Sequence, residues 1–353
     1  MKAALALAAL ALATAACAPA TGDQPNSTLS IARQPATRFS FHAFGDAGWA
    51  RSHGAEPLSG GGFERAYRAF DSGRELLGDI NYINWETSVG NQCDAYWSPA
   101  SASTFAFLTS PKELEAVTRI GFNLIGLANN HSYDCLRSAE GHGPLQTVAH
   151  IDTLKQHNTA ANRTVLFSGV FRSLDLQTPA TPFQLSTGTV PVRFLSAYVG
   201  GDQQHCRHLL CDRDLHRLKP AMGRSTGFRV LALHSWNPAS HTRLKRILRT
   251  WLEEGLVDIA IGTGPHVAES LAVIATPGGH GVLATSLGNF IHPGLAAQPN
   301  NILLISGWSF DQASGRVRLH ALSSRRVACH GAVCQAGPEQ AHPLPEGAAS
   351  RRG

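Results

Sequence analysis

The sequence predicts an α/β fold, and three features of the chain support this prediction. Apolar runs typical of strands alternate with segments that have helical spacing, as expected of an α/β domain. Several apolar runs lack the alternation of a half-exposed strand, so those strands are expected to be buried on both faces. Polar side chains directly follow several of these runs. With 353 residues, 43% of them hydrophobic, the chain is long enough for a large packed core.

In the first half of the chain, strands and helices alternate with clear boundary signals. Apolar and polar residues alternate over 39–44, which predicts a strand. A helix is expected after Ser110, which is suited to cap it, with Pro111 in the first helical position, Glu113 three residues after the cap and Gly121 at the end. The other elements expected here are a helix at 62–78, strands at 79–86 and 122–128, a helix at 145–158 and a strand at 164–171.

The second half of the chain continues this alternation and ends in an antiparallel-looking pair of strands. A helix is predicted over 240–255, because its apolar residues form one stripe closed by Gly255: Leu244, Ile247, Leu248, Trp251 and Leu252. The strands expected are 228–234, 256–262, 270–276, 281–291, 301–310 and 316–326.

The N-terminus has the pattern of an export signal. Lys2 precedes an Ala/Leu-rich core that is too short to span a bilayer, which predicts a signal peptide over 1–16. The segment Thr14–Cys17 resembles a bacterial lipobox, with Cys17 as the lipidated residue, and an ordinary cleaved signal is the alternative. Residues 17–37 read as a flexible tether. We therefore expect a bacterial envelope protein, lipid-anchored in the periplasm or outer membrane, or secreted if Cys17 is not lipidated.

Export makes the other cysteines interpretable. Six remain after Cys17, and an even number in an oxidising compartment favours disulfides. Cys206 and Cys211 are close enough in sequence to close one local loop, as are Cys329 and Cys334. Cys93 and Cys135 would then pair by elimination, although connectivity cannot be proved from sequence. A cysteine metal cluster is disfavoured, because no short Cys-x-x-Cys is present.

Composition and motifs exclude several classes of function. The net charge of +5 is modest and spread along the chain, which argues against nucleic-acid binding. Ser286 does not lie in a G-x-S-x-G nucleophile elbow, and the glycines at 60–62 lack the lysine of a phosphate-binding loop.

Five predicted strand ends carry groups able to bind a cation. Any one of these residues alone is more often a turn former or a helix cap, but five at equivalent topological positions predict a shared site, since ligands gather where the strands of α/β sheets end. Carboxylate oxygen together with imidazole nitrogen suits Mn, Fe or Zn rather than calcium. The residues are Asp46, Glu86, Asn130 with His131, His234 and His266.

These residues also carry a family resemblance. The chain resembles the CapA-type capsule-synthesis family, which is associated with poly-gamma-glutamate production and looks like a branch of the calcineurin-like metallophosphoesterases. The resemblance covers about residues 39–310, and the combination of ANNH with a distant SLGNF is its most specific part. The matching segments, in order, are FGD at 44–46, NWE at 84–86, LANNHSYD at 127–134, LHSW at 233–236, IGTGPHV at 261–267 and TSLGNF at 285–290.

The resemblance implies a four-layer sandwich, in which two β-sheets pack face to face and are flanked by helices. It also implies a metal site for one or two divalent ions, with His131 near the reacting group as a general acid or a stabiliser of the leaving oxygen. Asn84 and Asn289 would hold ligands or loops in place, with backbone capping as the alternative. The implied ligands are Asp46, Glu86 as the bridging carboxylate, Asn130, His234 and His266.

The chain departs from this pattern at two glycines. Gly264 replaces the first histidine of a His-Pro-His segment, and Gly48 stands where metallophosphoesterases carry a histidine two residues after Asp46. We therefore expect one ion to bind tightly and a second weakly or not at all. His292 could compensate, although a surface position is the expectation for it.

Two functions are compatible with these features. The first is an exported, metal-dependent hydrolase that cleaves a phosphoester or a bond of an envelope polymer. The expected substrate is an anionic polymer or a phosphoester. The second is a non-catalytic scaffold that helps the capsule synthesis machinery assemble, export or anchor its polymer. The expected domain spans residues 38–327, and residues 328–353 are expected to form a disulfide loop and a disordered tail.

Overall fold

The computed structural model describes residues 36–345, except for residues 59, 102, 178, 203, 224–225 and 296–297. The expected signal peptide at 1–16, the lipidation site Cys17 and nearly all of the expected tether lie outside these residues. Every statement below concerns the described residues.

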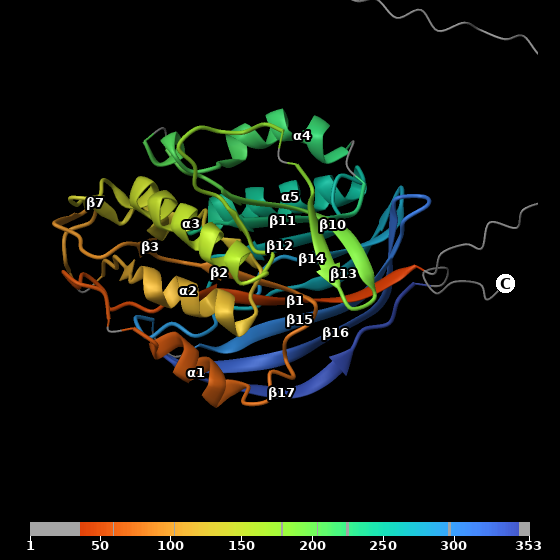
Figure 1. Ribbon diagram of the computed structural model, residues 1–353, viewed down its shortest axis with the longest axis horizontal. Coiled ribbons are helices and arrows are strands. Elements are labelled where there is room, and N and C mark those ends of the chain that lie inside the picture. The colour runs from red at the N-terminus through yellow and green to blue at the C-terminus, as the bar shows by residue number, and fades with distance from the viewer. Residues whose placement is uncertain are drawn as a thin grey trace, which may run out of the picture. The chain divides into compact units, whose positions relative to one another are not determined.

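Two mixed β-sheets form the centre of the fold (Figure 1). In the first, β1, β2, β6 and β8 run parallel, and β15, β16 and β17 add an antiparallel extension beside β1. In strand order, this sheet consists of β17 Val333–Ala341, β16 Arg316–His330, β15 Gln298–Asp311, β1 Thr37–Ala47, β2 Ile80–Trp85, β6 Leu124–Gly126 and β8 Leu166–Ser168.

The second sheet also has parallel central strands and antiparallel edges. Strands β10, β11, β12 and β14 are parallel neighbours, whereas β9 and β13 pair antiparallel at the two sides. In strand order, it consists of β13 Leu271–Thr276, β14 Gly279–Ala284, β12 Ile259–Thr263, β11 Phe228–His234, β10 Gly188–Tyr198 and β9 Thr181–Leu185. Two short pairs lie apart from both sheets: β3 Ser88–Val89 with β5 Leu108–Thr109, and β4 Ala95–Tyr96 with β7 Cys135–Arg137.

Three buried clusters show that the sheets and helices form four layers. One cluster joins the two sheets, with Phe41 and Tyr82 of the first sheet packed with Val230 and Ile261 of the second. A second cluster packs the first sheet against α1 Gly62–Phe70, α2 Pro111–Ile120 and α3 Gly143–Ala160. A third packs the second sheet against α4 Leu215–Gly223 and α5 Pro238–Glu253, which lie at the top of Figure 1. The predicted α/β sandwich is confirmed.

The helix predicted after Ser110 begins and ends where expected, but its glutamate has another partner. The Ser110 side chain accepts a hydrogen bond from the Lys112 N–H, and Gly121 ends α2 with a φ of 128°. The buried Glu113 carboxylate accepts from the backbone N–H groups of Gly62 and Phe63, at 2.9 and 3.0 Å. Glu113 therefore caps the first turn of α1, where unpaired N–H groups and the helix dipole favour an anion.

Parts of the predicted secondary structure are wrong, and one hairpin was not predicted. The helix expected over 62–78 ends at Phe70, because Asp71 accepts hydrogen bonds from the backbone of Glu75 and Leu76 and so closes a turn. The hairpin of β9 and β10 has no counterpart among the predicted strands. The expected disordered tail is ordered through Ala341, since β17 pairs with β16 as an edge strand, a position that tolerates proline.

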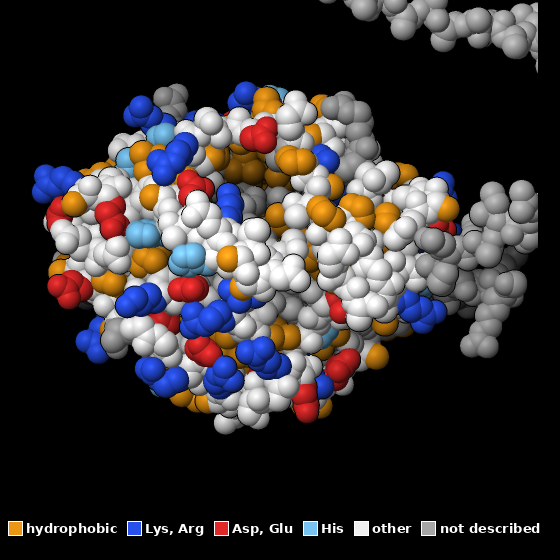
Figure 2. Space-filling model, viewed as in Figure 1, with side chains coloured by type: hydrophobic (Ala, Val, Ile, Leu, Met, Phe, Trp, Pro, Cys, Tyr) orange, Lys and Arg blue, Asp and Glu red, His pale blue; other side chains and the backbone are white. Residues whose placement is uncertain are grey.

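The chain carries the three predicted disulfides, Cys93–Cys135, Cys206–Cys211 and Cys329–Cys334. Three disulfides in one chain indicate a location outside the cytoplasm. No described helix combines the length and the apolar character needed to cross a bilayer. On the face shown in Figure 2, basic side chains lie interspersed with acidic ones, and Glu64 pairs with both Arg68 and Arg119.

The capping role of Glu113 leads to a first prediction. Glu113→Ala leaves two buried N–H groups without an acceptor, so we expect the free energy of unfolding to fall by about 2–3 kcal/mol, measured by urea denaturation. Glu115→Ala is the control. Glu115 lies on the same helix, is half-buried and forms ion pairs of 3.9 and 3.6 Å, so its loss should change the free energy of unfolding by less than about 0.5 kcal/mol. Equal effects of the two variants would show that Glu113 does not cap α1.

Candidate metal centre

The predicted ligands meet because the ends of parallel strands from both sheets lie together. Asp46 is in β1, Glu86 follows the neighbouring strand β2, and Asn130 begins the 3-10 turn Asn130–Tyr133 after β6. His234 ends β11, and His266 follows the adjacent strand β12 in the other sheet. The first sheet thus supplies the carboxylates and the amide, and the second supplies two imidazoles.

His234 lies among the other predicted ligands. Its Nδ1 atom is 3.4 Å from Asp46 Oδ1, and its Nε2 atom is 3.5 Å from Glu86 Oε1. The same Nε2 donates a hydrogen bond of 2.6 Å to Asn130 Oδ1. On the other side, His266 Nδ1 is 3.9 Å from Asp46 Oδ2. All five side chains predicted as ligands therefore belong to one cluster.

The two carboxylates have different surroundings. Burial alone would raise the pKa of Asp46, but His234, with help from His266 and Asn84, holds this pKa below its ordinary value. Burial and the nearby charge of Asp46 raise the pKa of Glu86 well above its ordinary value. Both oxygens of the buried Glu86 carboxylate lack a hydrogen-bond partner.

These surroundings fit a divalent cation. A buried carboxylate without partners is costly unless a positive charge compensates it. Asp46, Glu86 and His266 each offer one ligand atom, and these three atoms all lie within 4.8 Å of one another. Oxygen and nitrogen donors at this spacing are the donors that divalent transition metals bind.

Two amides hold the ligands in place. Asn84 Nδ2 donates to Asp46 Oδ1 at 2.6 Å, and its nitrogen is also 3.2 Å from His234 Nδ1. His266 Nδ1 donates to Asn289 Oδ1 at 2.7 Å, which fixes the orientation of this imidazole beside Asp46. Asn84 and Asn289 thus both contact side chains of the cluster.

His131 has a carboxylate partner that the sequence did not reveal. Its Nδ1 donates to Asp134 Oδ2 at 2.7 Å, and its Nε2 lies 3.9 Å from Glu86 Oε1. Burial opposes a charge on this imidazole, but Asp134, with a smaller contribution from Glu86, raises the pKa of His131 above its ordinary value. Asp134 lies three residues, or one helical turn, after His131, and this spacing could have predicted the contact between the two side chains.

Gly264 leaves no room for the missing imidazole. A Cβ atom at this position would lie 1.6 Å from the carbonyl oxygen of Ser235, and the backbone φ of 116° also disfavours any side chain. The Gly264 N–H instead donates to Asp46 Oδ2 at 2.9 Å. The backbone at position 264 thus contacts one of the carboxylates although no imidazole is present there.

The space beside Gly48 is occupied by His292. The surface position predicted for His292 is wrong, because the residue is only 1% exposed. Its Nε2 would lie 2.8 Å from a Cβ atom on Gly48. Burial, together with the charges of His131 and His266, lowers the pKa of His292 to about 3, so its ring is neutral. His292 fills the missing side chain's place but does not belong to the group of three close ligand atoms.

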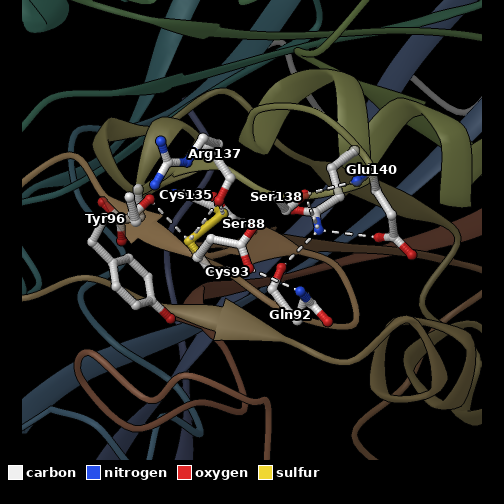
Figure 3. The surroundings of a disulfide bond; sticks show 12 residues. Ser88, Gln92, Cys93, Tyr96, Cys135, Arg137, Ser138 and Glu140 are labelled. Carbon is white, nitrogen blue, oxygen red and sulfur yellow. Dashed lines mark hydrogen bonds between the residues drawn. A yellow bond between two sulfur atoms is a disulfide. The ribbon is translucent and has the colours of Figure 1, made fainter.

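The Cys93–Cys135 disulfide joins the loops that follow Glu86 and His131 (Figure 3). Beside it, the Ser88 hydroxyl lies within hydrogen-bonding distance of the carbonyls of His131 and Ser132 and accepts from the Cys135 N–H. These contacts fix the turn that carries His131 against the chain that carries Glu86.

Comparison with known proteins identifies the family. Residues 62–293, more than half of the chain, match the family described as bacterial capsule synthesis protein PGA_cap. The chain belongs to this family. The family match confirms the resemblance to capsule-synthesis proteins that the sequence motifs predicted. No curated protein matches the chain. A solved structure of a hypothetical protein from Thermus thermophilus is 14% identical, with a TM-score of 0.41, over 85% of this chain and 100% of that chain.

The Cys93–Cys135 disulfide leads to a prediction about stability. It closes a loop of 42 residues, whereas Cys206–Cys211 closes one of 5. Loop-closure entropy gives losses of about 4 kcal/mol for the first and about 2 kcal/mol for the second when each pair is replaced by serine. Denaturant titration of the two double variants measures the difference. Equal losses would mean that the long loop is held by other contacts.

Glu86 leads to a prediction about metal-linked stability. Glu86→Gln puts a neutral amide in place of a buried carboxyl group whose ionisation is opposed by burial and by Asp46, so we expect the metal-free variant to melt at a higher temperature than the metal-free native chain. Saturating Mn²⁺ should stabilise the native chain by about 3 kcal/mol and the variant hardly at all, measured by calorimetry. Glu253→Gln, at the exposed end of α5, is the control and should behave like the native chain. A native chain that gains no stability from Mn²⁺, Fe²⁺ or Zn²⁺ would contradict a metal centre.

Proposed function

We propose that this capsule-synthesis protein is a metal-dependent hydrolase of a phosphoester or of an envelope-polymer bond. The single observation that carries this proposal is the buried Glu86 carboxylate, which has no hydrogen bond and shares a group of close ligand atoms with Asp46 and His266. Structural polar groups are normally hydrogen-bonded when buried, so a cluster of this kind indicates a ligand site. Membership of the PGA_cap family supports an association with capsule polymer.

In this proposal Asp46, Glu86, Asn130, His234 and His266 hold Mn, Fe or Zn. When bound, such an ion would supply Lewis-acid activation of water and of the bond to be cleaved. The chain itself supplies the proton. Because Asp134 occupies Nδ1 of His131, the Nε2 atom on the Glu86 side is the one that delivers a proton to the departing oxygen. Asp134 acts through His131 as a positioning residue.

We propose one tightly bound ion rather than two. Metal sites with several ions need ligands on every side, and the two positions that would provide further imidazoles are glycines. The space that a side chain at position 264 would need is occupied by the Ser235 backbone, and the space at position 48 is occupied by the His292 ring. The remaining compact group of Asp46, Glu86 and His266 has enough ligand atoms for one ion.

The second candidate is a scaffold that binds capsule polymer without turnover, and Gly264 is the observation that favours it. A site that has lost an imidazole can retain an ion for structural reasons alone. In either case we propose an envelope protein that is anchored through a lipid on Cys17 and works with the capsule synthesis machinery on an anionic polymer or a phosphoester.

Metal content and activity of three variants test the proposal. We expect about one ion per chain by elemental analysis of the native protein, and hydrolysis of p-nitrophenyl phosphate with Mn²⁺. His131→Ala should keep the ion and lower kcat by a factor of about 10² to 10⁴. Asp46→Ala should lose the ion and the activity together. His216→Ala, an exposed histidine of α4, should change neither.

The scaffold predicts a different pattern. If His131→Ala and Asp46→Ala both support normal capsule export in cells, and the purified native chain hydrolyses no phosphoester, catalysis is not the function. Two ions per chain would contradict the single-ion proposal while leaving hydrolysis in place.

A further inference from the structure

A cavity of about 450 Å³ lies directly beside the metal centre. Gly264 and His266 line it, and both also contact Asp46 in the cluster. The connection between β11 and α5, with Trp236, and α5 itself, with Lys245, also line the cavity. One ligand could therefore occupy this cavity and reach the metal centre at the same time.

The polar wall of the cavity is fixed and electrically balanced. Glu269 Oε2 is 3.0 Å from His241 Nε2 and 2.9 Å from Lys245 Nζ. The other nitrogen of His241 is 3.0 Å from the Ser235 hydroxyl. An anion would be repelled by Glu269 and a cation by Lys245, whereas hydroxyl groups can donate to the first and accept from the second. The wall therefore favours an uncharged ligand with several hydroxyls.

The cavity also has an exposed aromatic side. Trp236 is 63% exposed, whereas Trp85, Trp251 and Trp308 are fully buried in the core. An indole left in solvent beside a polar wall is an arrangement that binds amphipathic rings, because the ligand can stack on one side and form hydrogen bonds on the other. A pyranose combines an apolar C–H face with a rim of hydroxyls and meets both conditions.

We propose that this cavity binds a sugar ring of the substrate, stacked on Trp236, with the bond to be hydrolysed at the metal centre. The inference names the substrate class of the site in the proposed function and rests on that function for the reaction. The claim that the cavity binds a sugar is argued from the cavity residues alone, and it can be tested without measuring catalysis.

The binding test uses metal-free protein labelled with 5-fluorotryptophan. Methyl glycosides of glucose, galactose and N-acetylglucosamine are titrated, and the fluorine signal of Trp236, assigned by its loss in Trp236→Phe, is followed. At least one glycoside should shift this signal saturably, while inorganic phosphate should not. In Glu269→Gln, which leaves Lys245 uncompensated, phosphate should begin to shift it. No shift with any glycoside, or a stronger shift with phosphate in the native chain, would overturn the proposal.

The kinetic test compares glucose 1-phosphate and N-acetylglucosamine 1-phosphate with p-nitrophenyl phosphate. Trp236→Ala should raise KM for the better sugar phosphate about tenfold, through loss of stacking. Trp97→Ala, an exposed tryptophan outside the cavity lining, is the control and should leave KM for the sugar phosphate unchanged.

The two tests separate the two proposals. Saturable glycoside binding without hydrolysis of any phosphoester would keep the sugar site and remove the hydrolase. Hydrolysis of p-nitrophenyl phosphate without glycoside binding, and with equal KM values in native chain and Trp236→Ala, would keep the hydrolase and remove the sugar site.

Discussion

The structure depends on the compensation of two carboxylates buried at neighbouring strand ends. Asp46 is satisfied by the chain itself, through the Asn84 amide and the Gly264 N–H. Glu86 is not, because neither of its oxygens has a hydrogen bond. The difference divides the site into a part that the folded chain completes and a part that needs an added positive charge. Two imidazoles, those of His131 and His234, lie 3.9 and 3.5 Å from the Glu86 carboxylate.

The face-to-face sheets explain how residues more than two hundred positions apart come to share this charge. Each sheet ends its parallel strands at the same edge, and the core between the sheets aligns those edges. Asp46 and His234 lie within strands, so the sheets themselves hold these two side chains in position. The loop that carries His131 lacks such support from a sheet, and the Cys93–Cys135 bond with the contacts of Ser88 supplies it instead.

The sequence predicted what depends on local patterns. Strand ends with polar residues pointed to Asp46, Glu86 and His234, and a cap with a closing glycine located α2. It did not predict the partner of Glu113, since nothing in the local pattern says which neighbouring helix a carboxylate will reach. His292 was misjudged for the same reason. His292 is buried because its ring occupies the space that a side chain at position 48 would fill, and this neighbour is known only from the folded chain.

The close approach of Ser235 to Gly264 also limits how this chain can change. Replacing the glycine with histidine would drive a side chain into the Ser235 carbonyl, so an imidazole cannot be introduced here by one substitution. The connection between β11 and α5 would have to be rebuilt at the same time. That connection also forms part of the cavity wall, through Trp236 and Asn237. In this chain, adding an imidazole at position 264 would therefore also change the shape of the neighbouring pocket.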